Sequence, residues 1–139
     1  MQKLKSTMAE QVAHAASDFQ KERTGHTPDA VTVVLSEETL VITLHGALSP
    51  AEKDLAKSEA GAARVLEFHR QLFTNSAETL RDEITRITGV AVCEASSEVE
   101  TTTGTVVQVF TTGTMVQVFQ LAQSVPAETW SSRRANGLP

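Results

Sequence analysis

The residues best suited to chemistry lie in the stretch LHGALSPAEKDLAKS, which covers residues 44–58. Ser49 and Glu52 have the spacing of a capping box, in which the serine oxygen accepts from the backbone amide of Glu52 and the glutamate accepts from that of Ser49. Pro50 takes the first helical position, where its missing N–H costs nothing. These residues therefore predict the start of a helix, not a reaction centre.

A set of charged residues in and after this stretch can bind an anion or the carboxylate of a partner. Lys53 follows Glu52 directly, and Arg70 lies further on in a long helical pattern. Two cations beside the free amides of a helix start are suited to hold negative charge. The competing interpretation, which we favour, is an ion pair in which Arg70 ties one helix to another. Lys53, Arg70 and Glu52 remain the candidate binding residues.

Histidine and cysteine spacing gives little support for a metal or a nucleophile. The chain has four histidines, none three or four residues from another: His14, His26, His45 and His69. A zinc site would need ligands from separate elements, for example His45, Cys93 and Glu98. We expect structural roles for the histidines and a free, buried thiol at Cys93. The sequence predicts no catalytic residue, no metal and no cofactor.

Composition narrows the classes of partner. The chain has 139 residues, a formal net charge of −5, 4% aromatic residues and one cysteine. Scattered basic residues do not form the concentrated patch that phosphate binding needs, so nucleic acid is disfavoured. No apolar run approaches the length that spans a bilayer, so we expect no direct membrane insertion. A single cysteine fits a reducing compartment, and we expect a cytoplasmic protein.

Apolar periodicity predicts the first half of the fold. A stripe at helical spacing indicates a helix over about residues 2–23, which Gly25 is suited to end. Alternating apolar residues then predict a hairpin, with strands at 30–35 and 40–45.

The second half repeats this order. A short helix is expected over about residues 50–57 and a long one over about 59–88, ended by Gly89. Strands at 90–99 and 105–110 follow, with Gly104 in the turn between them. The order αββ-ααββ predicts an α+β fold, a four- or five-stranded antiparallel sheet with the helices on one face.

A tandem repeat of nine residues, 103–111 and 112–120, makes the end of the chain unusual. We expect a turn between the copies and an additional strand from Met115 to about Ala122. Its uncharged edge would invite pairing, so we expect a homodimer. Residues 1–123 are assigned to a single α+β domain and residues 124–139 to a flexible tail.

Several of these segments together resemble a known bacterial family. GALSPAEKDLAKSEAGAARVLEFHRQL, with TGHTP before it and ITGV and TTTGTVVQVF after it, resembles the MpsC-like family, which is named for a sodium-translocating, membrane-potential-generating system. The similarity runs from about Met8 to Phe110 and includes Arg70, Gly89 and Gly104. Thr27 replaces a glycine of the family pattern, Glu98 replaces an aspartate, and the second nonapeptide looks like an insertion.

The resemblance implies a cytoplasmic accessory protein of a membrane system that moves sodium or inorganic carbon. Our leading hypothesis is a non-enzymatic accessory or regulatory module that works by protein–protein contact. The alternative is a sensor domain that binds a small anion or metabolite near Arg70.

Overall fold

Three helices and four strands follow one another in the computed structural model, which describes residues 7–111, 121 and 125–126. In chain order they are α1 (Met8–Thr24), β1 (Ala30–Ser36), β2 (Thr39–His45), α2 (Pro50–Leu55), α3 (Glu59–Thr88), β3 (Glu94–Glu100) and β4 (Thr105–Thr111). The predicted order αββ-ααββ is confirmed.

Local side-chain chemistry sets the ends of the helices. Thr7 and Glu10 form a capping box at the start of α1, and Ser49 and Glu52 form the predicted one at the start of α2. Helix α3 is a single helix of 30 residues, as the unbroken apolar phase indicates. It ends at Gly89, whose φ of 76° lies in the left-handed region that favours glycine.

The four strands form one antiparallel sheet in the order β1-β2-β4-β3. Strand β4 lies between β2 and β3, so that Gln108 pairs with Ile42 on one side and with Ser97 on the other. Among the described strands, β1 and β3 are therefore the edges of the sheet. Strand β3 carries three glutamates on its seven residues, whereas β1 carries no charge.

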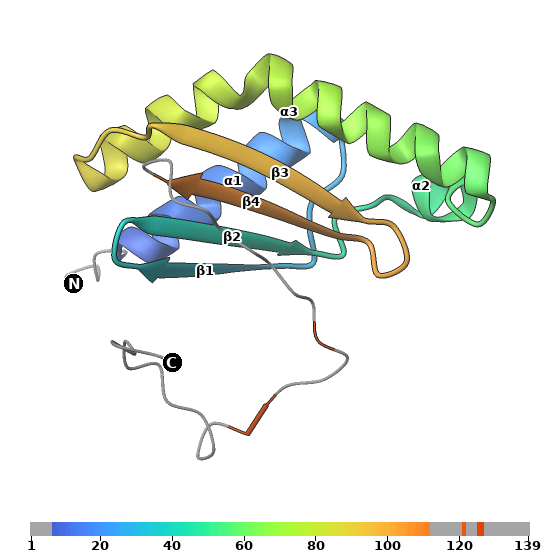
Figure 1. Cartoon of the computed structure of the whole chain (residues 1–139), viewed down its shortest axis with the longest axis horizontal. Helices are drawn as coiled ribbons and strands as arrows, with labels where there is room; N and C mark the ends of the chain where they lie inside the picture. Colours follow the sequence, from blue (N-terminus) through green and yellow to red (C-terminus); the bar gives the residue numbers. More distant parts are fainter. Residues whose placement is uncertain (1–6, 112–120, 122–124, 127–139) are drawn as a thin grey trace, which may run out of the picture.

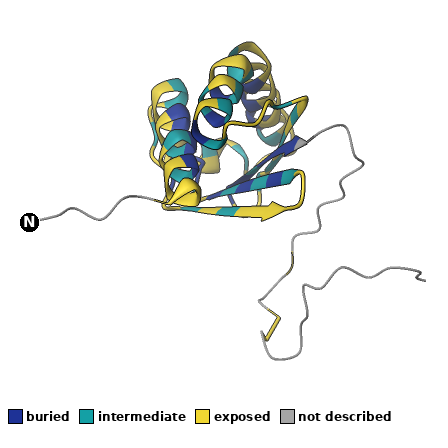
Figure 2. Cartoon of the chain, turned by 90° about the vertical axis from the view of Figure 1, so that its left-hand side faces the viewer, coloured by how far each residue is buried: buried dark blue, intermediate teal, exposed yellow. Residues whose placement is uncertain are grey.

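Helices α1 and α3 lie on the same face of this sheet, as predicted (Figures 1 and 2). Strand residues that face the helices are apolar and buried, among them Ile42, Leu44 and Phe110. They meet the buried residues of both helices in one core that includes Val12, Ala16, Phe19, Phe73, Leu80, Ile84 and Ile87. The buried aromatic residues of this core are all phenylalanines. The opposite face of the sheet exposes Thr32, Val34, Ser96 and Glu98.

The third strand begins later than its β-branched residues indicate. The sequence predicts a strand from Val90, but β3 starts at Glu94. The side chain of Arg81 on α3 donates to the carbonyl oxygens of Val92 at 2.9 Å and of Cys93 at 3.3 Å. These carbonyl oxygens therefore bond to the helix instead of to a neighbouring strand. The predicted fifth strand, Met115 to about Ala122, and most of the predicted tail lie outside the described residues.

Candidate functional site

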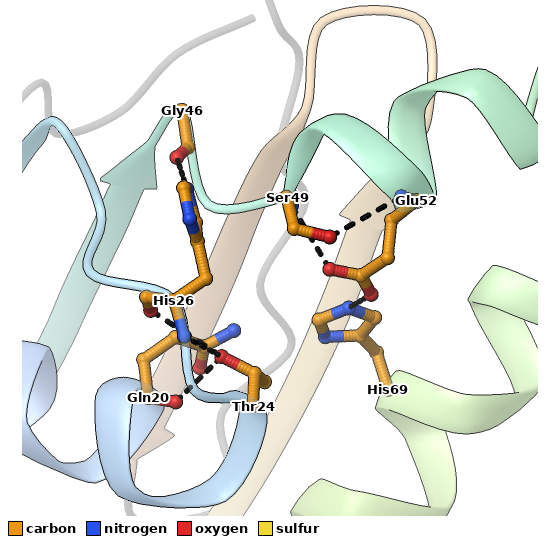
Figure 3. Close-up of polar contacts among 7 residues, drawn as sticks. All are labelled: Gln20, Thr24, His26, Gly46, Ser49, Glu52 and His69. Atoms are coloured by element: carbon orange, nitrogen blue, oxygen red, sulfur yellow. Dashed lines mark hydrogen bonds and ion pairs between the residues drawn. The ribbon is translucent and has the colours of Figure 1, made fainter.

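Glu52 uses both carboxylate oxygens, one for its own helix and one for the next helix. Its Oε1 accepts from the Ser49 backbone N–H at 2.9 Å, while its own N–H donates to the Ser49 hydroxyl at 3.2 Å. Its Oε2 lies 2.6 Å from Nε2 of His69, which projects from α3 (Figure 3). Because an ionised carboxylate only accepts, Nε2 of His69 carries the proton. The contact joins α2 to α3.

Burial and hydrogen bonding act in opposite directions on Glu52. Burial of the carboxyl raises its pKa, but the Ser49 backbone N–H and then His69 lower it, and the net effect lies below the ordinary value. His69 itself is only 4% exposed. The pair is therefore a hydrogen-bonded carboxylate and imidazole at the edge of the core.

Arg70, the next residue along α3, points into solvent. Its Nη2 atom bonds both carboxylate oxygens of Glu67, at 2.8 Å and 2.9 Å, within the same helix. The expectation that Arg70 ties one helix to another is therefore wrong, because His69 makes that connection. The pKa of Arg70 is raised by its hydrogen bond to Glu67.

Lys53 is exposed. Its side-chain stem lies beside Gly104, at 3.3 Å from the position that a β-carbon on this glycine would take. Of the three candidate binding residues, Glu52 is bonded to Ser49 and His69, and Arg70 is bonded to Glu67. The described residues show no hydrogen bond or ion pair that joins Lys53, Glu52 and Arg70 to one another.

The other histidines and the cysteine take different places. His26 reaches the carbonyl oxygen of Gly46 at 3.0 Å (Figure 3), and His45 lies 3.0 Å from the hydroxyl of Thr32. Cys93 is exposed, so the expectation of a buried thiol is wrong. It lies in the segment before β3, not on the strand. Within the described part of the chain, no three His, Cys, Asp or Glu residues gather as metal ligands.

Two buried glutamines have an unsatisfied polar atom. Gln20 on α1 is 3% exposed and Gln108 on β4 is 1% exposed. Among the described residues, Nε2 of Gln20 and Oε1 of Gln108 have no hydrogen-bond partner. Such groups lower stability when they are left without a partner.

The described residues form an apolar hollow. The segments that line it lie at the opposite end of the molecule from α2, on the left of Figure 1. Its volume is about 430 Å³. It is lined by the start of α1, the β1–β2 hairpin, the end of α3 with the segment after it, and the end of β4: Met8, Ala9, Val12, Val33, Leu35, Glu37, Glu38, Leu40, Ile84, Thr88, Val90, Ala91, Val92 and Phe110.

Most of this lining is apolar, and part of it is open to solvent. Leu35 is 71% exposed, Val90 65% and Met8 57%. Glu37 and Glu38, in the turn between β1 and β2, are the two acidic residues that line the hollow. We call this site the acidic-rimmed hollow. Its volume lies within the range of pockets that bind small molecules.

Comparison with known proteins gives the family. The profile of a family described as "Na+-translocating membrane potential-generating system (MpsC)" matches residues 4–114. The chain belongs to this family. A similar protein is the "Uncharacterized protein YbcI" of Bacillus subtilis (strain 168), 26% identical over 110 residues, which are 79% of this chain and 89% of that protein. No solved structure matches.

The MpsC match places both sites described above inside the family region. It also takes in the first nonapeptide and stops at residue 114, early in the second. No helix in the described ranges is long and apolar enough to cross a membrane.

Sequence reasoning missed His69 and the hollow. His69 could have been found, since it stands four residues before Phe73 and four after Val65 on the buried stripe of α3. The hollow has no such signal, because its walls come from four segments that lie far apart in the chain.

Proposed function

We propose that this MpsC-family chain is a non-enzymatic, cytoplasmic accessory protein that works by protein contact. Its partner would be a component of a membrane system that translocates sodium or inorganic carbon. The family description supports the link to such a system. The observation that carries the proposal is the acidic-rimmed hollow, because an apolar concavity with exposed apolar walls is suited to bind an apolar side chain of another protein.

Charge supports a particular kind of partner segment. Cytoplasmic loops of membrane proteins carry an excess of lysine and arginine close to their apolar spans. A segment of this composition would place its apolar residue in the hollow and its cations beside Glu37 and Glu38. The net charge of −5 would further favour encounter with a basic segment at low ionic strength.

Substitutions at the exposed rim test this proposal. Leu35→Asp and Val90→Asp would place a charge on apolar walls that are open to solvent, so the fold should survive and binding should fall at least tenfold. Leu66→Asp is the matched control, since Leu66 is 41% exposed on α3 but does not line the hollow. The measurement is retention of integral membrane proteins from native membranes, with each retained protein identified and its binding repeated in purified form.

Circular dichroism of each variant shows whether the fold is kept. Equal binding by the rim variants and the control would contradict the assignment to the hollow. If the unaltered protein retains no integral membrane protein, the accessory role itself is wrong.

We also propose that the protein is a homodimer that pairs through the edge of β1, instead of through the additional strand expected from the sequence. This edge strand is uncharged over Ala30–Ser36, whereas β3 at the other edge carries Glu94, Glu98 and Glu100. Like charges oppose the approach of two β3 edges, and an uncharged strand edge invites pairing. A second copy pairing antiparallel along β1 would extend the sheet.

The alternative hypothesis, an anion sensor near Arg70, stays a prediction. It requires an anion to compete with Glu67 for a guanidinium that lies in solvent. A thermal-shift series with bicarbonate and sulfate tests it, because a ligand that binds only the folded protein raises its melting temperature.

A further inference from the structure

The tandem repeat contains the central strand of the sheet twice. Residues 103–111 read TGTVVQVFT and residues 112–120 read TGTMVQVFQ, which are identical at seven of nine positions. The first copy contains all of β4. Only Val106 and Thr111 differ, and their counterparts are Met115 and Gln120.

The position of β4 makes strict demands on the strand that fills it. Val106, Gln108 and Phe110 are each 2% exposed or less on the helix-facing side, between β2 and β3. Gly104, just before the strand, has a φ of 73°, and its carbonyl oxygen accepts from the N–H of Ala47 at 2.8 Å. A side chain at this φ would be strained.

The second copy meets each of these demands at the same spacing. Gly113 corresponds to Gly104, Gln117 to Gln108 and Phe119 to Phe110. If the second copy replaces the first as a whole, each of its residues takes the place of the residue nine positions earlier. Each side chain then lies on the same face of the sheet as the side chain that it replaces. Of the residues that β4 buries against the helices, only Val106 would change, to methionine, whose flexible side chain adapts to irregular space.

We propose that the chain holds two interchangeable β4 strands, and that residues 114–120 occupy the β4 position in a second register. The inference does not rest on the proposed function. In the described register, the connection from β3 to β4 is residues 101–104. In the second register it would be residues 101–113, and a loop of that length closes about six-fold less readily. The second register is therefore the minor one.

Exchange between the registers moves nine residues from one end of the molecule to the other. In the described register, the second copy follows Phe110, which lines the acidic-rimmed hollow. In the second register, the first copy joins the connection before the strand, at the end of the molecule where Gly104 lies next to Lys53 and Leu48 in the described register. A partner that binds the surplus segment at either end would shift the population toward the register it fits.

Disulfide trapping distinguishes the registers in the full-length chain. In a Cys93→Ser background, Val41→Cys with Val109→Cys reports the described register, in which these residues pair directly. Val41→Cys with Val118→Cys reports the second register, and Val41→Cys with Met115→Cys is an out-of-register control. Each protein is refolded in a glutathione buffer, and its disulfides are located by peptide mass spectrometry.

The proposal expects an intramolecular 41–118 disulfide above the level of the 41–115 control. Adding Phe110→Ala should increase it several-fold, since the first copy then loses its buried ring, and adding Phe119→Ala as well should abolish that increase. A 41–118 disulfide at control level with Phe110→Ala present overturns the proposal. A 41–118 disulfide found only between two molecules also overturns it.

Thermal unfolding gives an independent measurement without cysteines. Phe119→Ala alone should leave the melting temperature unchanged, whereas Phe110→Ala should lower it and the double variant should lower it at least twice as far. Equal melting temperatures for Phe110→Ala and the double variant would mean that the second copy never replaces the first.

Discussion

Glu52 has two structural roles that are usually separate, helix capping and contact with a neighbouring helix. A second capping box, Thr7 with Glu10, shows the first role alone, because it is exposed and its hydrogen bonds stay within α1. The comparison isolates the contact with His69. The exposed capping box is thus an internal control for how much the buried imidazole–carboxylate contact contributes to the stability of the fold.

Glu52→Gln should lower the free energy of unfolding at pH 7 by about 1–2 kcal/mol, because a hydrogen bond to a charged group is lost at a partly exposed site. Folding lowers the pKa of Glu52, so its contribution is complete above the ordinary value of 4.5 and is lost as the pH falls through the lower folded value. The difference between the two proteins should therefore shrink below about pH 4.5. Urea unfolding at pH 7 and across the acid range measures it.

Glu10→Gln is the matched control for this experiment. It alters the exposed capping box and leaves His69 and its partner intact. A loss as large as that of Glu52→Gln would show that capping alone explains the effect.

At this scale the sequence predicts local contacts better than distant ones. The bond between Ser49 and Glu52 follows from a spacing of three residues, and it is present. The bond between Glu52 and His69 spans 17 residues and depends on the angle at which α2 meets α3. From the sequence alone, the permanent charge of Arg70 makes it a better candidate than His69 for the contact with α2. Its position on α3, however, places its side chain in solvent.

The junction of α2 and α3 depends on one small residue. Gly61 is buried in the first turn of α3, where its N–H donates to the capping hydroxyl of Ser58 at 3.0 Å. A β-carbon there would lie 1.8 Å from the carbonyl oxygen of Leu55, the last residue of α2. The close approach of the two backbones holds α2 where Glu52 meets His69.

Gly61→Ala should therefore lower the free energy of unfolding by about 1–3 kcal/mol through steric overlap with backbone. Helix propensity alone predicts the opposite sign, a gain of about 0.5–1 kcal/mol. Urea unfolding decides between the two. Ala63→Gly, at an exposed position of the same helix, should show the ordinary loss of about 1 kcal/mol. A Gly61→Ala protein as stable as the unaltered one would mean that the junction is loose.

Where an element has a clear apolar periodicity and a residue that signals its end, the sequence predicts both the element and its boundaries. The predicted long helix, residues 59–88, is the one found, because apolar phase and Gly89 both act locally. The predicted start of β3 is wrong because Val90 and Val92 favour a strand, while Arg81 binds the backbone of this segment from 11 residues away. Propensity gives no information about such a contact.

At the scale of the whole molecule, the two edges of the sheet differ in charge. The layers follow from the sequence, since both long amphipathic helices need one apolar face of the sheet. The strand order β1-β2-β4-β3 does not follow from it, because either hairpin could lie with either strand at the centre. The order makes β1 and β3 the edges among the described strands.

Val34→Lys tests the proposed dimer. Val34 is 52% exposed on β1, and a lysine on an edge strand opposes pairing with a second copy. Light scattering after size-exclusion chromatography should give a dimer for the unaltered protein and a monomer for the variant. Ser96→Lys on β3 is the control and should remain a dimer. A monomeric unaltered protein at micromolar concentration would contradict the proposal.

Because the aromatic residues of the core are phenylalanines, which emit only weakly, the folded domain has almost no ultraviolet fluorescence of its own. The chain has no tyrosine, and its single tryptophan, Trp130, lies outside the described residues. A Trp130→Phe background would therefore give a dark protein. A tryptophan introduced at Leu35 would then be its only strong emitter, and a change in its colour or brightness would report what enters the acidic-rimmed hollow in real time.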